Sequence, residues 1–244
     1  MEIGLVSYRS KNKDVAYNMR QIERAMREAQ GKAELLCFGE AFVQGFDSLS
    51  WDFETDKEIA LDRGSETIET LCRWTKTYNV ALLTGYIERE DDRIYSSCIV
   101  IEDGRILHNY RRISAGWKEI GIADAHYREG DETGEFQFRG RLFMPALCGD
   151  LWEYTERFKT ENVLIWPVYV SIPQDLWEQG QLLEYAQQAA LAAHETLMIN
   201  SIDPDNDNVG GAFRSRDGEI VEGIPFGKEG ILFTNLSNPE DNTL

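Results

Sequence analysis

Short apolar runs alternate with segments of helical spacing along almost the whole chain. Runs of about four to eight apolar residues are typical of buried strands, whereas apolar residues that return every three or four positions indicate a helix with one buried face. The helical spacing predicts helices over 15–29, 59–78 and 176–196. The apolar runs predict strands at 3–8, 34–38, 80–87, 95–101, 106–110, 142–148, 163–170, 197–201, 210–215, 219–221 and 231–236.

Two of the connections between strands are short turns. The chain has Asp-Gly at 103–104 and again at 217–218, each time between two strand-like runs. Because Asp-Gly favours a tight hairpin turn, both pairs of runs are expected to be antiparallel. The remaining strands alternate with helices, which is typical of βαβ units. The pattern therefore predicts an α/β fold with helices on the outside of stacked sheets.

No linker, internal repeat or low-complexity segment divides the chain. We therefore expect one domain over residues 1–244, with a frayed polar tail at 237–244. At this length the chain can bury a substantial core.

The charge balance narrows the range of partners. Against 25 Lys and Arg stand 43 Asp and Glu, a net charge of −18. Phosphate groups are bound by clustered Lys and Arg, so nucleic acid and anionic membranes are not expected partners. No apolar stretch is long enough to span a membrane, and residues 1–6 lack the features of a secretion signal. We expect a cytoplasmic protein.

One of the four cysteines differs from the others. Cys37, Cys72 and Cys98 lie within apolar patterns and are interpreted as small buried residues in a reduced protein. Cys148 instead ends the apolar run 142–147 and is followed directly by Gly149. A strand that ends in a thiol at a turn is a common way for an α/β fold to present a nucleophile.

A thiol nucleophile needs a group that accepts its proton. Glu40 follows the strand-like run 34–38, and a carboxylate at a strand end can act as general base. The three histidines are less well placed, since they fall in a hairpin strand, a charged loop and a long helix: His108, His126 and His194.

Acyl transfer also needs a cation or N–H group that stabilises the developing oxyanion. The segment 110–119 supplies Arg112 and Lys118. A metal is not expected, because the acidic stretch 203–208 lacks the spacing of a calcium loop. No glycine motif for phosphate binding appears either. The sequence therefore implies no cofactor.

Three segments resemble motifs of the nitrilase superfamily of carbon–nitrogen hydrolases. Residues 33–40 resemble the block that carries the general base, residues 109–112 the block that carries a lysine, and residues 146–152 the nucleophile block. The resemblance runs from Ile3 to about Leu236. It implies a four-layer α-β-β-α sandwich and a Glu-Lys-Cys triad.

By this resemblance Cys148 is the nucleophile, Glu40 the general base, and the N–H of Gly149 part of the oxyanion site. The sequence departs from the family pattern at Gly39, where proline is usual, at Gly149, where an aromatic residue is usual, and at Arg112, where lysine is usual. We expect Lys118 to act as the catalytic cation and Arg112 to support it. Three further residues are expected near the substrate: Glu119, in the region of a second substrate-positioning glutamate, and Trp117 and Trp152, as pocket walls.

The predicted function is hydrolysis of a non-peptide amide, carbamoyl or nitrile group of a small molecule through an acyl-enzyme on Cys148. The resemblance also implies a homodimer or larger homo-oligomer. Two alternatives stay open: a non-catalytic binding module, which the arginine at position 112 favours, and an acyltransferase that uses the same thioester.

Overall fold

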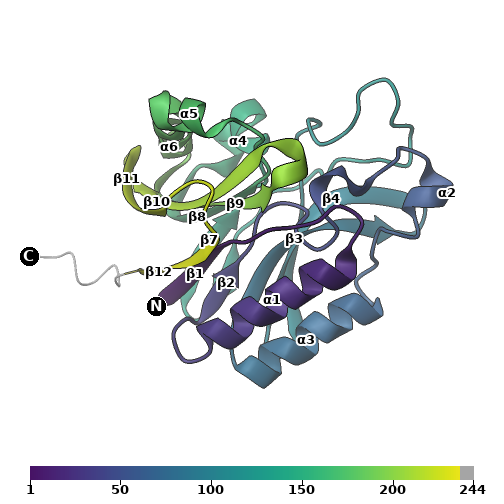
Figure 1. Cartoon of the computed structure of the whole chain (residues 1–244), viewed down its shortest axis with the longest axis horizontal. Coiled ribbons are helices and arrows are strands. Elements are labelled where there is room, and N and C mark those ends of the chain that lie inside the picture. Colours follow the sequence, from purple (N-terminus) through teal and green to yellow (C-terminus); the bar gives the residue numbers. More distant parts are fainter. Residues whose placement is uncertain (237–244) are drawn as a thin grey trace, which may run out of the picture.

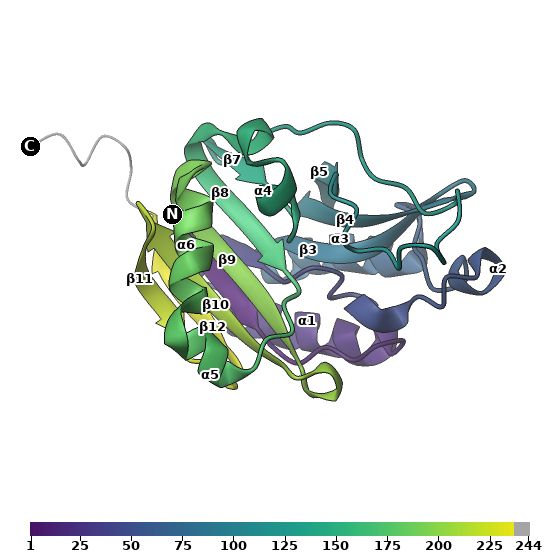
Figure 2. The same cartoon turned by 90° about the horizontal axis from the view of Figure 1, so that it is seen from above.

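Two six-stranded sheets form the centre of the protein, and helices cover their outer faces (Figures 1 and 2). The computed structural model describes residues 1–236. One sheet has the strand order β12-β1-β2-β3-β4-β5 and the other β11-β10-β9-β8-β7-β6. Helices α1 and α3 pack on the first sheet, and α6 packs on the second. The predicted four-layer α-β-β-α sandwich is confirmed.

The strands of the first sheet are β1 (Glu2–Ser7), β2 (Leu35–Cys37), β3 (Ala81–Glu90), β4 (Arg93–Glu102), β5 (Arg105–Arg111) and β12 (Gly230–Asn235). Those of the second are β6 (Phe136–Phe138), β7 (Arg141–Pro145), β8 (Thr160–Val168), β9 (Ala193–Asp203), β10 (Asn208–Arg216) and β11 (Glu219–Ile224). The α-helices are α1 (Val15–Ala29), α2 (Phe53–Asp56), α3 (Glu66–Tyr78), α4 (Asp150–Glu153), α5 (Gln174–Leu176) and α6 (Leu182–Ala190). Short 3-10 helices lie at Phe46–Ser48, Thr155–Phe158 and Pro204–Asn206, and a π-helix at Trp177–Gln181 joins α5 to α6.

Most predicted elements are present, and both hairpins are confirmed. Strands β4 and β5 are antiparallel, as are β10 and β11. The Asp and Gly of each turn have positive φ, namely 44° and 74° at 103–104 and 50° and 80° at 217–218. These values match the left-handed backbone that a tight hairpin turn requires.

Two predicted helix boundaries are wrong. The last long helix ends at Ala190, and the residues from Ala193 onward form β9, between β8 and β10. Glu195 lies on that strand and pairs with Arg214 and Arg216. Helix α3 begins only at Glu66, after Ser65, whose side chain caps it. In both places strand pairing outweighs local helical spacing: residues 193–196 pair with β8 and β10, and Leu61 pairs with Glu88 of β3.

Aromatic side chains help to join the two sheets. Phe136 on β6 stacks against His108 on β5, with ring centroids 5.5 Å apart, and against Phe143 on β7. Strand β6 was not among the predicted elements. A second core, between the first sheet and its helices, includes Ile22 of α1 and Leu71 of α3.

Strand β8 connects the two segments that hold the predicted base and nucleophile. The backbone N–H of Cys148 donates to the carbonyl of Pro167 (3.0 Å), and that of Glu40 donates to the carbonyl of the next residue, Val168 (3.3 Å). Glu40 follows β2 in one sheet and Cys148 follows β7 in the other. Their meeting place is therefore set by the end of β8.

Within residues 1–236 no helix is long and apolar enough to cross a membrane. The predicted frayed tail at 237–244 lies outside the described residues.

Candidate active site

Cys148 occupies the apex of a sharp turn between β7 and α4. Its φ of 39° is a left-handed backbone conformation, which is unfavourable for a residue with a side chain by about 1–2 kcal/mol. Its backbone N–H donates to Pro167, and its carbonyl accepts a hydrogen bond from the indole N–H of Trp166 (2.9 Å). The surrounding structure thus holds the strained turn in place. The thiol is partly buried, with Sγ 3.6 Å from the carbonyl of Tyr169.

The pKa of the Cys148 thiol lies above its ordinary value. Burial and the nearby Glu40 carboxylate raise its pKa to about 12, while the guanidinium of Arg112 opposes this rise. Burial also raises the pKa of the thiols of Cys37, Cys72 and Cys98. Of the four, Cys148 alone lies at a strand end beside both a carboxylate and a guanidinium. A reaction at Cys148 would therefore need its proton to be removed by a neighbouring group.

The carboxylate of Glu40 is fully buried and held on one side only. Its Oε1 accepts hydrogen bonds from the hydroxyl of Ser96 (2.8 Å) and from Nη1 of Arg112 (2.9 Å). Its Oε2 is buried and has no hydrogen-bond partner among residues 1–236. One carboxylate oxygen is thus anchored, and the other is left available as a proton acceptor.

Arg112 is the cation that the fold brings to Glu40. Its side chain is only 2% exposed, and its Nε donates to the hydroxyl of Ser114 (2.7 Å). Burial opposes the charge, but the Glu40 carboxylate outweighs it, so the pKa of Arg112 is raised and the guanidinium stays charged. The backbone of Arg112 is fixed as well, because its N–H donates to Ser96 and its carbonyl accepts from Gly130 (both 2.8 Å).

Lys118 and Glu119 lie in the loop that follows. The Lys118 ammonium pairs with the carboxylate of Glu129 and donates to the carbonyl of Tyr127 (3.3 Å). Glu119 is exposed, and its carbonyl caps a turn. The geometry therefore brings Arg112, rather than the expected Lys118, to the buried carboxylate. The reason is positional: Arg112 directly follows β5, whereas Lys118 is carried away by the loop.

A different glutamate borders the nucleophile turn. The carboxylate of Glu153, on α4, lies close to Gly149 and Gly116: a Cβ atom built on these glycines would be 3.5 Å and 3.7 Å from its Oε1. Glu153 is exposed, and nothing in its sequence spacing separated it from other surface glutamates.

The buried carboxylate of Asp150 ties the nucleophile turn to the segment that carries Arg112. It accepts four hydrogen bonds: from the hydroxyl of Tyr110 (2.6 Å) and from the backbone N–H groups of Ile113 (3.1 Å), Ser114 (2.8 Å) and Leu147 (2.8 Å). Leu147 precedes the nucleophile, while the other three residues flank Arg112. Asp150 thus fixes the distance between the thiol and the guanidinium.

We expect Asp150→Ala to lower the free energy of unfolding by about 3 kcal/mol, because it leaves four buried donors without an acceptor. Asp150→Asn should have a smaller effect, since its amide oxygen still accepts part of this set. Urea unfolding followed by tryptophan fluorescence measures both. Glu156→Ala, at an exposed site, is the matched control. Equal stabilities of Asp150→Ala and the control would contradict this role.

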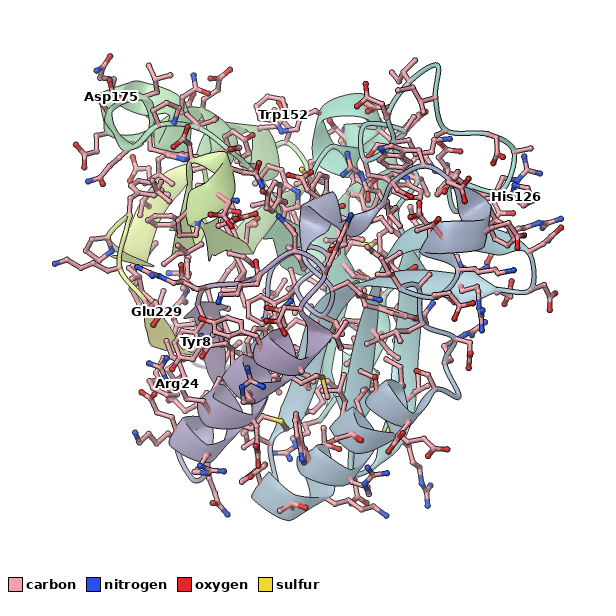
Figure 3. All side chains as sticks on the ribbon, turned by 45° about the vertical axis from the view of Figure 1, so that its right-hand side comes forward. Tyr8, Arg24, His126, Trp152, Asp175 and Glu229 are labelled. Carbon is pink, nitrogen blue, oxygen red and sulfur yellow. The ribbon has the colours of Figure 1, made fainter. Side chains whose placement is uncertain are left out.

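The two tryptophans expected in the pocket lie in different surroundings. Trp152 is exposed on α4 (Figure 3). Its ring and that of Tyr185 form a T-shaped pair with centroids 5.1 Å apart. Trp117 is buried in a cluster with Trp51 and with Ala41, the residue after Glu40. Trp117 therefore shares a cluster with the residue that follows Glu40, and Trp152 lies on the surface of α4.

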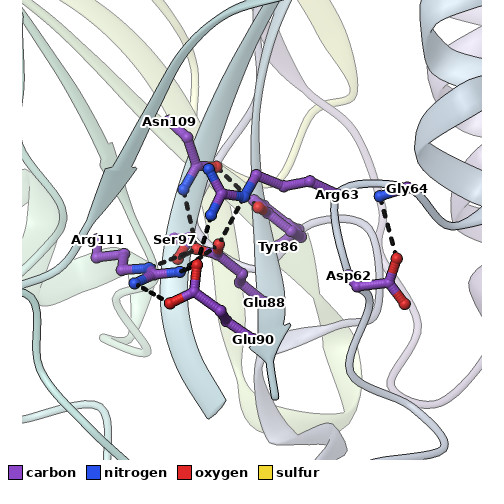
Figure 4. Close-up of polar contacts among 9 residues, drawn as sticks. All are labelled: Asp62, Arg63, Gly64, Tyr86, Glu88, Glu90, Ser97, Asn109 and Arg111. Atoms are coloured by element: carbon purple, nitrogen blue, oxygen red, sulfur yellow. Dashed lines mark hydrogen bonds and ion pairs between the residues drawn. The ribbon is translucent and has the colours of Figure 1, made fainter. Parts of the chain in front are cut away.

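A second ionic cluster surrounds Glu88 on β3 (Figure 4). Glu88, whose side chain is fully buried, accepts hydrogen bonds from Ser97 (2.6 Å), Asn109 (2.9 Å) and Arg111 (2.7 and 3.0 Å). Successive side chains of a strand point to opposite faces. Ser97 and Arg111 therefore contact Glu88 on the face of the first sheet that its helices cover. Their neighbours Ser96 and Arg112 contact Glu40 on the face toward the second sheet.

Ser96, Ser114 and Asp150 were not singled out from the sequence as site residues. Two adjacent serines inside an otherwise apolar strand, at 96–97, are a signal that could have drawn attention to Ser96. Within residues 1–236 no group of His, Cys, Asp and Glu is arranged to hold a metal ion.

Comparison with known proteins identifies the family. The family model for carbon–nitrogen hydrolases matches residues 2–152, which include Glu40, Arg112 and Cys148. The chain belongs to the carbon–nitrogen hydrolase family, and the predicted resemblance to the nitrilase superfamily is confirmed.

Two curated relatives match part of the chain. An (R)-stereoselective amidase from a Pseudomonas species is 27% identical over 151 residues, which cover 62% of this chain and 52% of the amidase. A glutamine-dependent NAD(+) synthetase from Thermotoga maritima is 25% identical over 59% of this chain and 24% of its own length. The match thus spans about half of the first relative and a quarter of the second.

Solved structures share the fold over almost the whole chain. A CN-hydrolase superfamily protein from Xanthomonas campestris has a TM-score of 0.80 at 15% identity, over 97% of this chain and 90% of that protein. An amidase from a Nesterenkonia species has a TM-score of 0.74 at 16% identity, with the same coverage. Another structure of that amidase carries acrylamide added at its active-site cysteine.

Proposed function

We propose that the protein is a cysteine-dependent hydrolase of a non-peptide carbon–nitrogen bond, most simply a small-molecule amide. The observation that carries the proposal is the buried Glu40–Arg112 ion pair beside Cys148, in which one oxygen of Glu40 has no hydrogen-bond partner among the described residues 1–236. This arrangement supplies a nucleophile, a base and a fixed positive charge. The amidase among the relatives supports the same class of reaction.

In the first half of the proposed reaction the thiol attacks the amide carbon. Oε2 of Glu40 takes the thiol proton as the carbon–sulfur bond forms, because the thiolate is scarce at neutral pH. The carbonyl oxygen becomes negative, and the guanidinium of Arg112 together with the N–H of Gly149 stabilises it. That N–H has no hydrogen-bond acceptor within the described part of the chain. Protonated Glu40 then gives its proton to the leaving nitrogen, and a thioester on Cys148 remains.

In the second half water cleaves the thioester. Glu40, again ionised, takes a proton from the water as it attacks the same carbon. The tetrahedral oxyanion forms at the same place and is stabilised by the same groups. Its collapse releases the acid, and Glu40 returns the proton to the sulfur, which restores the starting state of the enzyme.

In this proposal Arg112 takes the role that the sequence assigned to Lys118. Arginine stays charged throughout the reaction, and its planar head can bind a carboxylate and an oxyanion through different nitrogens. The burial of this arginine against the proposed base supports a catalytic cation over the non-catalytic binding module.

A panel of aliphatic amides, N-carbamoyl compounds and nitriles, assayed for released ammonia, tests the proposal. We expect release from at least one substrate by the native protein and none by Cys148→Ala. Adding hydroxylamine separates the acyltransferase alternative, which should form hydroxamate faster than free acid. No release and no hydroxamate with any substrate would overturn the proposal.

A further inference from the structure

Two glycines border the guanidinium of Arg112 where it faces the nucleophile turn. A Cβ atom on Gly149 would lie 2.6 Å from Nη2 of Arg112 and 3.1 Å from the hydroxyl of Ser114. A Cβ atom on Gly116 would lie 3.1 Å from the same Nη2. A carbon at 2.6 Å is well inside van der Waals contact, so a side chain at position 149 has to displace the guanidinium.

The backbone does not explain why position 149 is glycine. Gly149 has φ −63° and ψ −12°, which is the ordinary right-handed helical region that every residue adopts readily. The conformational freedom of glycine is therefore not used here. What the glycine provides is the volume that Nη2 fills.

The guanidinium has little freedom to move out of this volume. Its Nη1 is held by Glu40 and its Nε by Ser114, so any displacement of the head breaks at least one of these buried hydrogen bonds. A lysine at position 112 would end in a single ammonium and would leave the space next to Gly149 empty.

We propose that Gly149, assisted by Gly116, is a positioning residue for Arg112. Together the two glycines form a site for the wide head of an arginine and place Nη2 beside the backbone N–H of Gly149. The arginine at 112 and the glycine at 149, which depart separately from the family pattern, are then one linked feature. This inference rests on the proposed function, but its test does not need a substrate.

The readout is the rate of alkylation of Cys148 by iodoacetamide at mildly alkaline pH, followed by peptide mass analysis. Only the thiolate reacts, and its population changes tenfold for each unit of pKa. Arg112 lowers the pKa of the thiol, whereas Glu40 and Asp150 raise it. Moving the guanidinium away therefore slows alkylation.

Four proteins are compared: the native chain, Gly149→Ala, Arg112→Lys, and the double variant. We expect Gly149→Ala to slow alkylation about tenfold in the native background and less than about twofold in the Arg112→Lys background. The comparison in the Arg112→Lys background measures any direct effect of the alanine on access to the thiol, so that this effect can be subtracted. Gly134→Ala, where a Cβ atom meets nothing within 4 Å, is the control for glycine replacement and should leave the rate unchanged.

Equal slowing in both backgrounds, or no slowing in either, would overturn the proposal. If thermal unfolding shows that Gly149→Ala does not fold, Gly116→Ala in the same two backgrounds makes the test, with a smaller expected slowing because its contact is longer. Because alkylation is measured without an amide, a protein that hydrolyses nothing can still confirm the linkage. A protein that hydrolyses amides can likewise refute it.

Discussion

Cys148→Ala and Cys148→Ser should both reduce the turnover of any amide substrate by at least about three orders of magnitude. The reason is that the proposed reaction passes through a bond to Sγ, and the other thiol near Glu40, that of Cys98, is fully buried in the middle of β4. Serine keeps the shape of the side chain, but its hydroxyl is a much weaker acid than a thiol. Steady-state release of ammonia measures the loss, at an enzyme concentration high enough for the residual rate of the variants to be detected.

The folded state should survive these changes. Alanine and serine face the same left-handed backbone at φ 39° as cysteine does, and the thiol is only partly buried, so stability should change by less than about 1 kcal/mol. Cys72→Ala, at a half-buried thiol on α3, is the matched control and should keep full activity. Activity retained in Cys148→Ala would mean that the nucleophile lies elsewhere.

Arg112→Ala should reduce kcat by about 100- to 1000-fold, because it removes the charge that stabilises the oxyanion. It should also lower the free energy of unfolding by about 3 kcal/mol, since the buried Glu40 carboxylate is left without its counterion. Arg112→Lys keeps a positive charge and should recover part of both losses. Steady-state kinetics and urea unfolding on the same preparations measure the two effects separately.

Lys118→Ala is the matched control, because Lys118 is the residue expected from the sequence to act as the cation. Its partly exposed ammonium pairs with Glu129 rather than with Glu40, so we expect near-native kcat and a stability change of at most about 1 kcal/mol. An inactive Lys118→Ala beside an active Arg112→Ala would reverse the assignment of the cation. Losses of equal size in both would point to a loop movement on substrate binding that brings Lys118 into the site.

Much of the fold could be predicted from the sequence, because the relevant signals are local. Helix 15–29 has the predicted boundaries, since its apolar face lies within the segment and the capping Asp14 directly precedes it. Both Asp-Gly turns were identified for the same reason. The positions of Glu40 and Cys148 at strand ends were also predictable, because each directly follows an apolar run.

Other features depend on residues that are far apart in the chain. The segment 193–196 continues a helical pattern, but it forms a strand because β8 and β10 lie on either side of it. Neighbouring strands supply hydrogen bonds and packing that outweigh local propensity.

The sequence by itself determined the class of fold, the nucleophile and the base as candidates, and the departure from the family pattern at Arg112 and Gly149. Only the tertiary structure showed that Arg112 lies against Glu40 while Lys118 pairs with Glu129, because six residues of loop can carry a side chain toward a site or away from it. It also placed Ser96, Ser114 and Asp150 around the pair, and it brought Gly149 against the guanidinium. These are contacts between segments joined only by folding, and no local pattern of apolar and polar residues records them.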